Sequence, residues 1–456
     1  MANVALVVLD TLRKDSFEEH FDWLPGTYYE NAYSPSHWTV PVHASMFTGR
    51  YPSEVGVYAN SEKLDCPETV LAESLSDAGY TTRAFSANGN ISDYFMFDRG
   101  FDEFRVNWRA EGWKEELEFK EKSNVFDWKS FNSETEYEYP VRPLVGILRS
   151  VLGDYDTLPS LKHGFNRKMR GPGSPKLSDD PEDYGSKEAL GYVRSREFGD
   201  DEFLFLNIMD AHNPYQPPED YRTVEPVRIH GLKATVRGPD ADDDRVRQAY
   251  DDSVRYLSDM YRKIFEEIEP DFDHIITLSD HGELLGEHDS WEHLCGLYPE
   301  LIHVPLSVYP GTGQDGDDGM VNLIDVYATV LDATGVETSN IRHRTRGESL
   351  LNGIEPRDTV SEFHGLSRLH VQSLDEDWME RVRYMDVELD AIASPPTYYG
   401  YETFDGFEEY GETQVSDTRQ RLNELIDEKQ KRETEQENYN DMSDEVLDRL
   451  EDLGYA

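Results

Sequence analysis

Uninterrupted runs of apolar residues, each followed within two residues by an aspartate, most narrowly limit the fold of this chain. The run from Asn3 to Leu9 is followed by Asp10, and similar runs span Glu202 to Met209 and His274 to Leu278. Such runs are typical of parallel strands that are buried on both faces of a sheet. Ligands bind at the carboxyl ends of such strands, so polar residues there are candidate site residues.

Helical patterns alternate with these strands. Glu68 to Ala78 is amphipathic and ends at Gly79, Tyr80 to Ala87 has the composition of a strand, and Asp244 to Ile268 carries apolar residues at helical spacing. This order predicts an α/β fold, a doubly wound and mostly parallel sheet with helices on both faces.

The strand and helix alternation is interrupted between residues 106 and 195, which are rich in Trp, Glu, Lys, Tyr and Pro. We interpret 106–195 as a lid insertion in a catalytic domain of residues 1–355. Residues 356–456 are predicted to form a small C-terminal α+β subdomain with charged helices. The insertion contains a basic cluster, which either attracts an anionic substrate or is a solvated loop: Lys162, His163, Arg167, Lys168 and Arg170.

The net charge of the chain is extremely negative. Its 456 residues include 93 acidic and 44 basic side chains, a formal charge of -49. Such a charge repels nucleic acid and anionic membranes, and we expect neither as a partner. With 12% aromatic residues, the chain is not a disordered acidic protein. We therefore expect a halophilic surface, adapted to high salt that screens the repulsion.

Cysteine usage and hydropathy indicate the compartment. Two cysteines, Cys66 and Cys295, argue against a disulfide scaffold and favour a reducing environment. The first predicted strand begins too early to leave room for a signal peptide. No apolar run approaches the ~20 residues of a membrane span. We expect a soluble cytoplasmic protein.

Metal-binding residue types follow three of the predicted strands. These candidates are Asp10, Asp210 with His212, and Asp280 with His281. Carboxylate oxygens and an imidazole nitrogen suit Mg²⁺, Mn²⁺, Zn²⁺ or Ca²⁺ to different degrees. For Asp10, the alternative is that it caps the following turn.

A threonine between Ser36 and Pro52 is the candidate nucleophile. Thr39 stands two residues before Pro41, ahead of a helix-compatible segment from Ala44 to Phe47. The positive end of a helix dipole favours an alkoxide and an anionic substrate group. The alternative is that Thr39 is only an N-cap. Combined with the strand-end groups, Thr39 indicates metal-assisted ester hydrolysis.

Several motifs resemble, in family order, those of the sulfatase branch of the alkaline phosphatase superfamily. They are Val-Val-Leu-Asp10-Thr-Leu-Arg13, Thr39 through Thr48-Gly49-Arg50-Tyr51-Pro52, His212-Asn-Pro-Tyr215, Ser279-Asp280-His281-Gly282-Glu283 and Gly286-Glu287-His288. The resemblance covers residues 3 to about 352 and implies an alkaline phosphatase-like fold.

The resemblance also implies roles for individual residues. The implied ligands of a divalent metal ion are Asp10, Thr39, Asp280 and His281. Thr39 would also be the nucleophile, and His212 would contact the transferred group. His293 lies where many relatives carry a Lys that helps the leaving group, and His43 occupies the Arg position of the nucleophile motif; both are counted as catalytic.

Three positions, Thr39, His43 and Thr11, depart from the sulfatase pattern. Sulfatases oxidise a Cys or Ser in Cys/Ser-x-Pro-x-Arg to formylglycine, whereas Thr39 is a secondary alcohol that cannot give the aldehyde. The pattern Thr39-x-Pro41-x-His43 is closer to the phosphodiesterase and nucleotide pyrophosphatase relatives, which use a Thr alkoxide. Thr11 replaces the usual second Asp and removes an oxygen ligand.

We therefore predict a metal-dependent hydrolase that cleaves a sulfate or phosphate ester by in-line attack of Thr39. His212 would stabilise the oxyanion, and His293 or His288 would protonate the leaving oxygen. The substrate would be a small anionic ester, a sulfated or phosphorylated glycan being one candidate. Two alternatives stay open: a phospho- or sulfo-group transferase acting on a glycan or lipid, and an inactive binding homologue.

Overall fold

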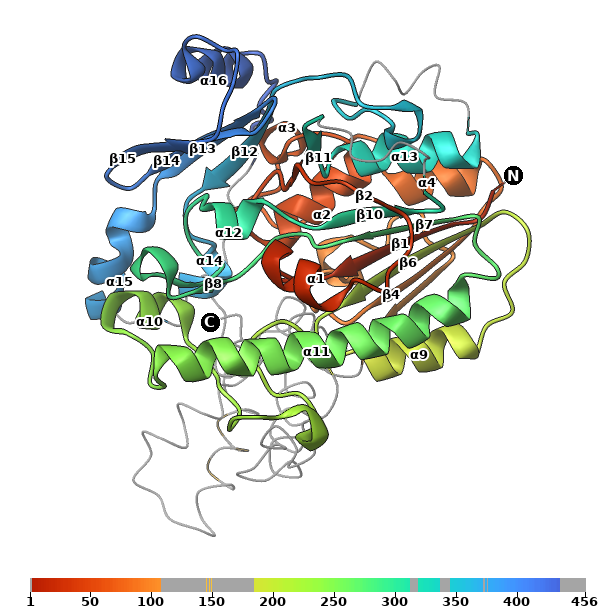
Figure 1. Ribbon diagram of the computed structural model, residues 1–456, viewed down its shortest axis with the longest axis horizontal. Coiled ribbons are helices and arrows are strands. Elements are labelled where there is room, and N and C mark those ends of the chain that lie inside the picture. The colour runs from red at the N-terminus through yellow and green to blue at the C-terminus, as the bar shows by residue number, and fades with distance from the viewer. Residues whose placement is uncertain are drawn as a thin grey trace.

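The central sheet of the computed structural model has seven strands in the order β2-β10-β7-β1-β6-β4-β5 (Figure 1). The structure describes residues 2–107, 184–311, 319–336, 345–371 and 376–434, with a few isolated positions. The strands are β1 (Val4–Leu9), β2 (Thr27–Tyr28), β4 (Thr81–Ser86), β5 (Glu103–Val106), β6 (Glu202–Ile208), β7 (His274–Leu278) and β10 (Leu306–Tyr309). Strand β10 is antiparallel to both of its neighbours, and the other pairs are parallel.

Strand β1 lies at the centre of this sheet, between β6 and β7. Val4 pairs with Phe203 on one side and with His274 on the other, and all six residues of β1 are fully buried. This confirms the buried parallel strands that the apolar runs predict. Because the three strands start level with one another, Asp10, Asp210 and Asp280 leave the sheet at the same edge.

Helices cover both faces of the sheet, as the doubly wound prediction requires (Figure 1). On one face lie α1 (Lys14–His20), α9 (Ser186–Arg194) and α11 (Asp243–Ile268); on the other lie α2 (Thr39–Thr48), α4 (Leu71–Asp77) and α13 (Asp325–Thr334). Helix α11 begins where the Asp242 carboxylate accepts a hydrogen bond from the Arg245 amide. Its apolar stripe, including Val246 and Leu257, is buried against the sheet.

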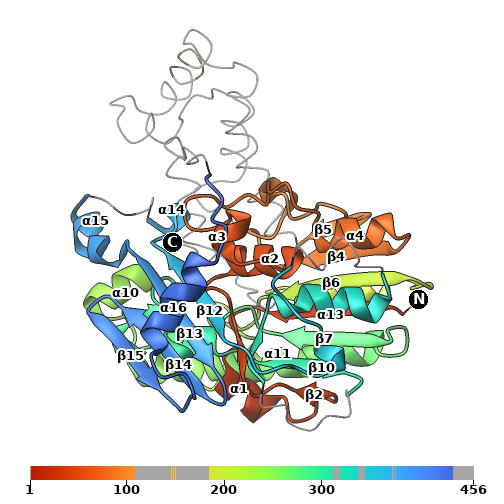
Figure 2. The same cartoon turned by 90° about the horizontal axis from the view of Figure 1, so that it is seen from above.

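A second sheet of four antiparallel strands lies beside the first (Figure 2). It consists of β12 (Thr359–His364), β13 (Glu388–Ser394), β14 (Tyr398–Thr403) and β15 (Gly406–Tyr410), accompanied by α14 (Arg368–Val371), α15 (Glu376–Val382) and α16 (Thr418–Asp427). Short elements complete the fold: β3 (Ala32–Tyr33), α3 (Pro52–Val55), α10 (Gly231–Arg237), β8 (Leu284–Leu285), β9 (Trp291–Glu292), α12 (Pro299–Ile302) and β11 (Val321–Asn322).

Some predicted boundaries need correction. Helix α9 falls within the segment 106–195 predicted as a lid, yet it packs against α11, and its Tyr192 is buried in the core. Residues 108–183, with the basic cluster from 162 to 170, lie outside the described residues apart from three isolated positions. Helix α2 begins at Thr39 rather than Ala44, because a proline is tolerated in a first helical turn, where its missing N–H has no intrahelical partner.

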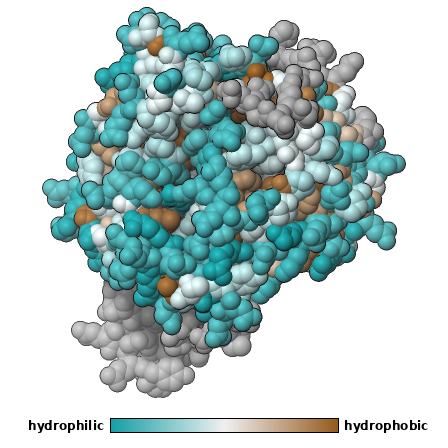
Figure 3. Space-filling view, in the orientation of Figure 1, coloured by the Kyte–Doolittle hydropathy of each residue, from teal (hydrophilic) through white to brown (hydrophobic). Residues whose placement is uncertain are grey.

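Hydrophilic residues dominate the face of the molecule in Figure 3, in keeping with the large negative charge. Within the described residues, no helix is both long and apolar enough to span a bilayer.

A buried ion pair ties the end of the described chain to the segment that follows α2. Glu362 of β12 accepts hydrogen bonds from the Ser53 amide (2.8 Å) and hydroxyl (2.8 Å) of α3, and from Lys429 (2.5 Å) and His364 (3.0 Å). Although burial raises the pKa of Glu362, the Lys429 ammonium and His364 hold that pKa well below its usual range.

Replacing Lys429 with methionine is expected to lower the free energy of unfolding by about 3 kcal/mol, because it leaves a buried carboxylate without its main counter-charge. Urea unfolding of the two proteins measures the difference. The matched control is Lys431→Met: this lysine is half exposed and 3.8 Å from Glu388, and we expect less than about 0.5 kcal/mol. Equal effects of the two substitutions would contradict the prediction.

Candidate active site

Three buried side chains meet at the carboxyl edge of the sheet. Asp10 follows β1, and Asp280 and His281 follow β7; all three are fully buried. His281 Nε2 lies 3.5 Å from Asp280 Oδ2 and 3.9 Å from Asp10 Oδ1. Their ligand atoms fall within 4.8 Å of one another, a spacing that could hold a metal ion.

Hydrogen bonds around these residues leave the metal-facing atoms available. His281 Nδ1 lies 2.9 Å from the Gly282 carbonyl, so Nδ1 carries the proton and the Nε2 lone pair faces the two carboxylates. Asp10 Oδ1 and Asp280 Oδ2 are buried and accept no hydrogen bond from any residue that the structure describes. Such oxygens are costly to bury unless a cation or donor faces them, so these residues fit a divalent ion.

Burial also disfavours the ionised form of the Asp10 and Asp280 carboxylates. Burial, with a further contribution from Asp280, raises the pKa of Asp10 to about 6, and burial raises the pKa of Asp280 to about 7. Burial lowers the pKa of His281, which keeps its imidazole neutral and able to ligate a metal. A bound cation would offset both the desolvation and the mutual repulsion of the acids.

The stabilisation of the folded protein by a bound metal ion is therefore expected to depend on pH. The raised pKa values mean that protonation of Asp10 and Asp280 stabilises the metal-free fold at acidic pH, and that this stabilisation is lost as the pH rises through about 6 to 7. A metal must compete with those protons below this range. We expect added Mn²⁺ or Mg²⁺ to raise the melting temperature by several degrees at about pH 8 and much less at about pH 5.5. An equal rise at the two pH values would contradict this.

Thr39 is the first residue of α2, and its hydroxyl faces the three proposed ligands. Its Oγ1 lies 3.3 Å from His281 Nε2 and accepts a hydrogen bond from Asn88 Nδ2 at 3.3 Å. The N-cap residue is Trp38, and no side chain caps this helix. The alternative that Thr39 is only an N-cap is therefore wrong.

His43 lies one turn further along α2, and its ring contacts the backbone of Thr39. Its Nδ1 lies 2.9 Å from the Thr39 carbonyl, and its Nε2 accepts from Asn207 Nδ2 at 3.2 Å. The ring is fully buried, and burial lowers its pKa to about 3. With both nitrogens engaged, neutral His43 is placed to position Thr39 rather than to touch a substrate.

Two asparagines at the site were not identified from the sequence. Asn88, which follows β4, and Asn207, within β6, both donate to Asp10 Oδ2, at 2.9 and 3.3 Å. These two hydrogen bonds engage Oδ2 of Asp10, while Oδ1 of Asp10 faces His281. An amide inside the apolar run of β6 was a usable signal for Asn207, since a buried polar side chain needs a partner.

Thr11 occupies the position of the second aspartate of the sulfatase pattern, but its hydroxyl does not supply an oxygen ligand in place of that aspartate. Its hydroxyl donates to the Asp10 carbonyl at 2.7 Å, while its amide donates to Asp280 Oδ1 at 3.3 Å. Its φ of 60° is unusual for a β-branched residue, and this strained turn directs the amide at Asp280.

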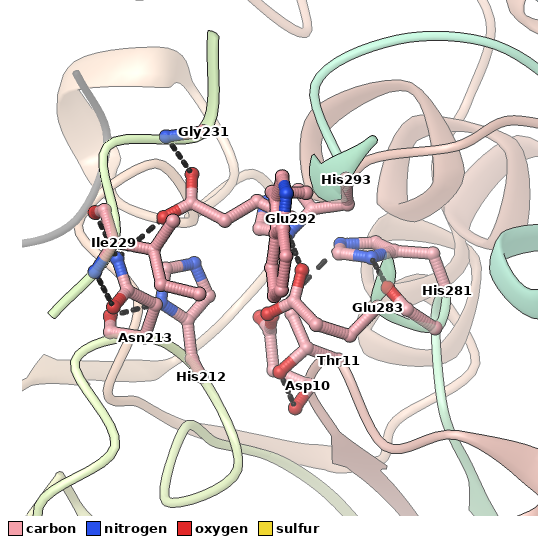
Figure 4. Close-up of polar contacts among 12 residues, drawn as sticks. Asp10, Thr11, His212, Asn213, Ile229, Gly231, His281, Glu283, Glu292 and His293 are labelled. Atoms are coloured by element: carbon pink, nitrogen blue, oxygen red, sulfur yellow. Dashed lines mark hydrogen bonds and ion pairs between the residues drawn. The ribbon is translucent and has the colours of Figure 1, made fainter. Parts of the chain in front are cut away.

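Three imidazoles extend from the acidic cluster (Figure 4). The ring centroid of His293 lies 4.5 Å from that of His281 and 5.1 Å from that of His212. His293 Nδ1 lies 2.9 Å from Glu283 Oε1, and Glu283 Oε2 accepts from the Tyr215 hydroxyl at 3.0 Å. The structure thus brings His212 and His293 beside the proposed metal ligands.

Two other candidates are engaged elsewhere. His288 stacks on Tyr298 and bonds to Glu300 at 3.1 Å. Asp210 accepts from the amides of Tyr184 and Ser186, where α9 begins. These contacts give Asp210 a structural role and leave His293 as the candidate acid.

A doubly wound sheet with buried acids and histidines at its carboxyl edge defines an alkaline phosphatase-like fold. The sulfatase family model matches residues 3–336, and the chain belongs to the sulfatase family. It is 22% identical over 366 residues to an uncharacterised sulfatase, YidJ, of Escherichia coli, covering 74% of this chain and 66% of that one. It is 24% identical over 361 residues to a choline-sulfatase of Rhizobium meliloti, covering 73% and 66%. Both matches span just under two thirds of the relative's length.

Among solved structures, a phosphonate monoester hydrolase from Silicibacter pomeroyi has a similar fold. Its TM-score is 0.60 at 18% identity, with 94% of each chain covered. This similarity confirms the predicted α/β architecture.

Proposed function

We propose that this protein is a metal-dependent hydrolase of sulfate or phosphate esters with Thr39 as its nucleophile. The observation that carries the proposal is the Thr39 hydroxyl, 3.3 Å from His281 Nε2 at the start of α2 and beside two buried acids that each have one oxygen without a hydrogen bond among the described residues. A hydroxyl is a weak nucleophile unless its surroundings favour the alkoxide. The helix dipole and a bound cation would both do so.

Asp10, Asp280, His281 and Thr39 would hold the metal, which would supply Lewis-acid stabilisation of the transferred group and of the Thr39 alkoxide. Thr39 would lose its hydroxyl proton to solvent, and the Oγ1 alkoxide would attack the sulfur or phosphorus atom in line with the ester oxygen, whose bond to that atom breaks. His212 would contact the transferred group. Water would then attack the same atom and give its proton to His293, and the bond to Thr39 Oγ1 would break, which releases sulfate or phosphate and restores the alkoxide.

His293 is the proposed acid for the leaving oxygen. Burial holds the pKa of His293 well below its usual range, so the ring is neutral in the free protein. The negative charge of a bound ester favours the imidazolium, so we expect the proton to be taken up with the substrate. Glu283 orients the ring through Nδ1, which leaves Nε2 for the leaving oxygen.

The chemistry of residue 39 bears on the choice of ester. A threonine cannot form the aldehyde of the usual sulfatases, which favours direct alkoxide attack. The phosphonate monoester hydrolase supports a phosphorus ester, and the choline-sulfatase supports a sulfate ester. A glycan substrate, a halophilic surface and a cytoplasmic location remain predictions.

A turnover panel tests the proposal. The purified protein, supplied in turn with Mg²⁺, Mn²⁺, Ca²⁺ and Zn²⁺, is offered an aryl sulfate, an aryl phosphate monoester and a bis-aryl phosphodiester. The panel is run at about 0.1 M and about 2 M KCl, because high salt screens the acidic surface. We expect metal-dependent hydrolysis that is higher in the concentrated salt. Transfer to an added alcohol in preference to water would favour a transferase, and binding of metal without turnover would favour an inactive homologue.

A further inference from the structure

The loop after β6 contains two residues that have no role in the proposed chemistry, although they lie next to His212 in the sequence. Asn213 and Tyr215 stand on either side of Pro214, and both side chains are fully buried. Neither side chain reaches the protein surface, so each makes its polar contacts with other buried groups. These contacts lead from two directions to His293, the proposed acid.

The first contact runs from Tyr215 to His293 through the carboxylate of Glu283. The Tyr215 hydroxyl donates to Glu283 Oε2 at 3.0 Å, and Glu283 Oε1 lies 2.9 Å from His293 Nδ1. Burial raises the pKa of Tyr215, so its hydroxyl keeps the proton that it donates. Among the described residues, Tyr215 is the one hydrogen-bond donor to Oε2. Without this donor, the carboxylate would be free to turn and would hold the imidazole less firmly.

Packing fixes the position of the Tyr215 hydroxyl. The backbone of Tyr215 exchanges hydrogen bonds of 2.8 and 3.2 Å with Val227, and its ring packs edge-on against Tyr250, with the centroids 5.4 Å apart. The Tyr250 hydroxyl in turn donates to the Thr11 carbonyl and accepts from the Arg13 amide, both at 2.9 Å. The hydroxyl that holds Glu283 is therefore built onto the turn that follows the central strand β1.

The second contact holds the backbone that carries His293. Glu292 precedes His293 and has a φ of 60°, which is unfavourable for a residue with a Cβ and persists only where the surroundings enforce it. Its carboxylate accepts from Asn213 Nδ2 at 2.6 Å and from the Gly231 amide at 3.1 Å (Figure 4). The Asn213 side chain also bonds to the amide and carbonyl of Ile229, each at 3.0 Å. With the backbone held in this way, the orientation of the His293 ring is the freedom that remains.

The same loop also fixes the other imidazole. His212 Nδ1 lies 2.6 Å from the Asn213 carbonyl, and the ring centroids of His212 and His293 are 5.1 Å apart. The transferred group and the leaving oxygen are bonded to each other in an ester. The two residues that serve them must therefore keep a fixed spacing, and a shared loop provides it.

We infer that Tyr215 is a positioning residue that aims His293 at the leaving oxygen through Glu283. This inference rests on the proposed ester hydrolysis, with His293 as the acid. Tyr215 would not touch the substrate. Its effect would fall on the protonation of the leaving oxygen, and the size of the effect would depend on how much the leaving group needs a proton.

The test compares two aryl esters of the same acid, with a para-nitrophenyl and a phenyl leaving group, in metal-loaded protein. Phenoxide is the poorer leaving group and needs the acid more. We expect Tyr215→Phe to lower kcat/KM roughly tenfold for the phenyl ester and less than about twofold for the nitrophenyl ester. The matched control is Tyr261→Phe, because Tyr261 of α11 is also fully buried but bonds to the Thr277 hydroxyl, at 2.5 Å. It should leave the ratio of the two kcat/KM values unchanged, and equal losses for the two esters in Tyr215→Phe would overturn the inference.

A double substitution distinguishes positioning from general structural damage. In a His293→Ala background there is no ring left to orient, so we expect Tyr215→Phe to cause no further loss with the phenyl ester. A further loss as large as in the wild-type background would show that Tyr215 acts by another route, which would overturn the inference.

Heteronuclear NMR of isotope-labelled histidine rings separates this inference from the proposed function, because it requires no turnover. We expect an Nδ1–H signal that exchanges slowly with water and is assigned to His293 by its loss in His293→Ala. Tyr215→Phe should accelerate this exchange several-fold, whereas Tyr261→Phe should not. Accelerated exchange supports the positioning role even if no ester is hydrolysed, and the absence of hydrolysis then overturns the proposed function alone. Unchanged exchange overturns the positioning role, and hydrolysis in that case leaves the hydrolase standing.

Discussion

Replacing Thr39 with alanine is expected to reduce kcat/KM for any hydrolysed ester by on the order of 10⁴-fold or more. The substitution removes the proposed attacking oxygen, which faces His281 Nε2 at 3.3 Å, while the three other proposed ligands keep their positions. We therefore expect metal binding to weaken far less than turnover. Steady-state kinetics and calorimetric metal titration of the two proteins measure the two quantities.

Thr39→Ser is the matched control for this prediction. It retains a hydroxyl on the first residue of α2, so we expect substantial activity to survive. Mass spectrometry after rapid acid quenching should detect a sulfo or phospho adduct on residue 39 in the wild-type chain and in the serine variant. Undiminished hydrolysis by Thr39→Ala would overturn the role of Thr39 as nucleophile.

Replacing Asp280 with asparagine is expected to weaken divalent-metal affinity by about 100-fold or more, since it removes a charged ligand from the cluster. The same substitution should raise the melting temperature of the metal-free protein at about pH 8 by a few degrees. The second effect follows because burial raises the pKa of Asp280 to about 7, so its ionisation beside Asp10 is costly without a cation.

The opposite signs of these two effects separate a metal site from a structural acid. Asp210→Asn is the control. Asp210 follows β6 at the same edge of the sheet as Asp280, but it accepts hydrogen bonds from backbone amides at the start of α9. It should lower stability with or without metal and leave the metal affinity unchanged. Destabilisation of the metal-free protein by Asp280→Asn would contradict the proposed site.

Much of the fold was predictable because the central strands are buried on both faces. A strand such as β1 has no solvent-facing side, so its residues form a continuous apolar run that a surface helix would not show. The start of α2 was less predictable, since Pro41 usually argues against a helix. Its place in the first turn, where no intrahelical partner is lost, reconciles the proline with the helix.

The supporting residues of the site were the hardest to predict. Asn88, Asn207 and Glu283 are far apart along the chain, and each acts through another side chain rather than on a substrate. Their partners, Asp10 for the two amides and His293 for the glutamate, are set by the sheet order and by the turn after β7. No local pattern records such pairings.

The sequence by itself determined the class of fold, the sulfatase-family motifs and the residue types that bear on chemistry. Hydrophobic periodicity and short motifs involve residues that are close in the sequence, so they can be recognised without the structure. Only the tertiary structure decided which of these residues meet: it turned Thr39 toward His281, brought the His43 ring to the Thr39 carbonyl, and removed His288 and Asp210 from the cluster. The parallel register of β1, β6 and β7 brings the ends of these strands level, and so brings the residues that follow them together. This register depends on contacts between residues that are hundreds of positions apart, and a local sequence pattern does not specify such contacts.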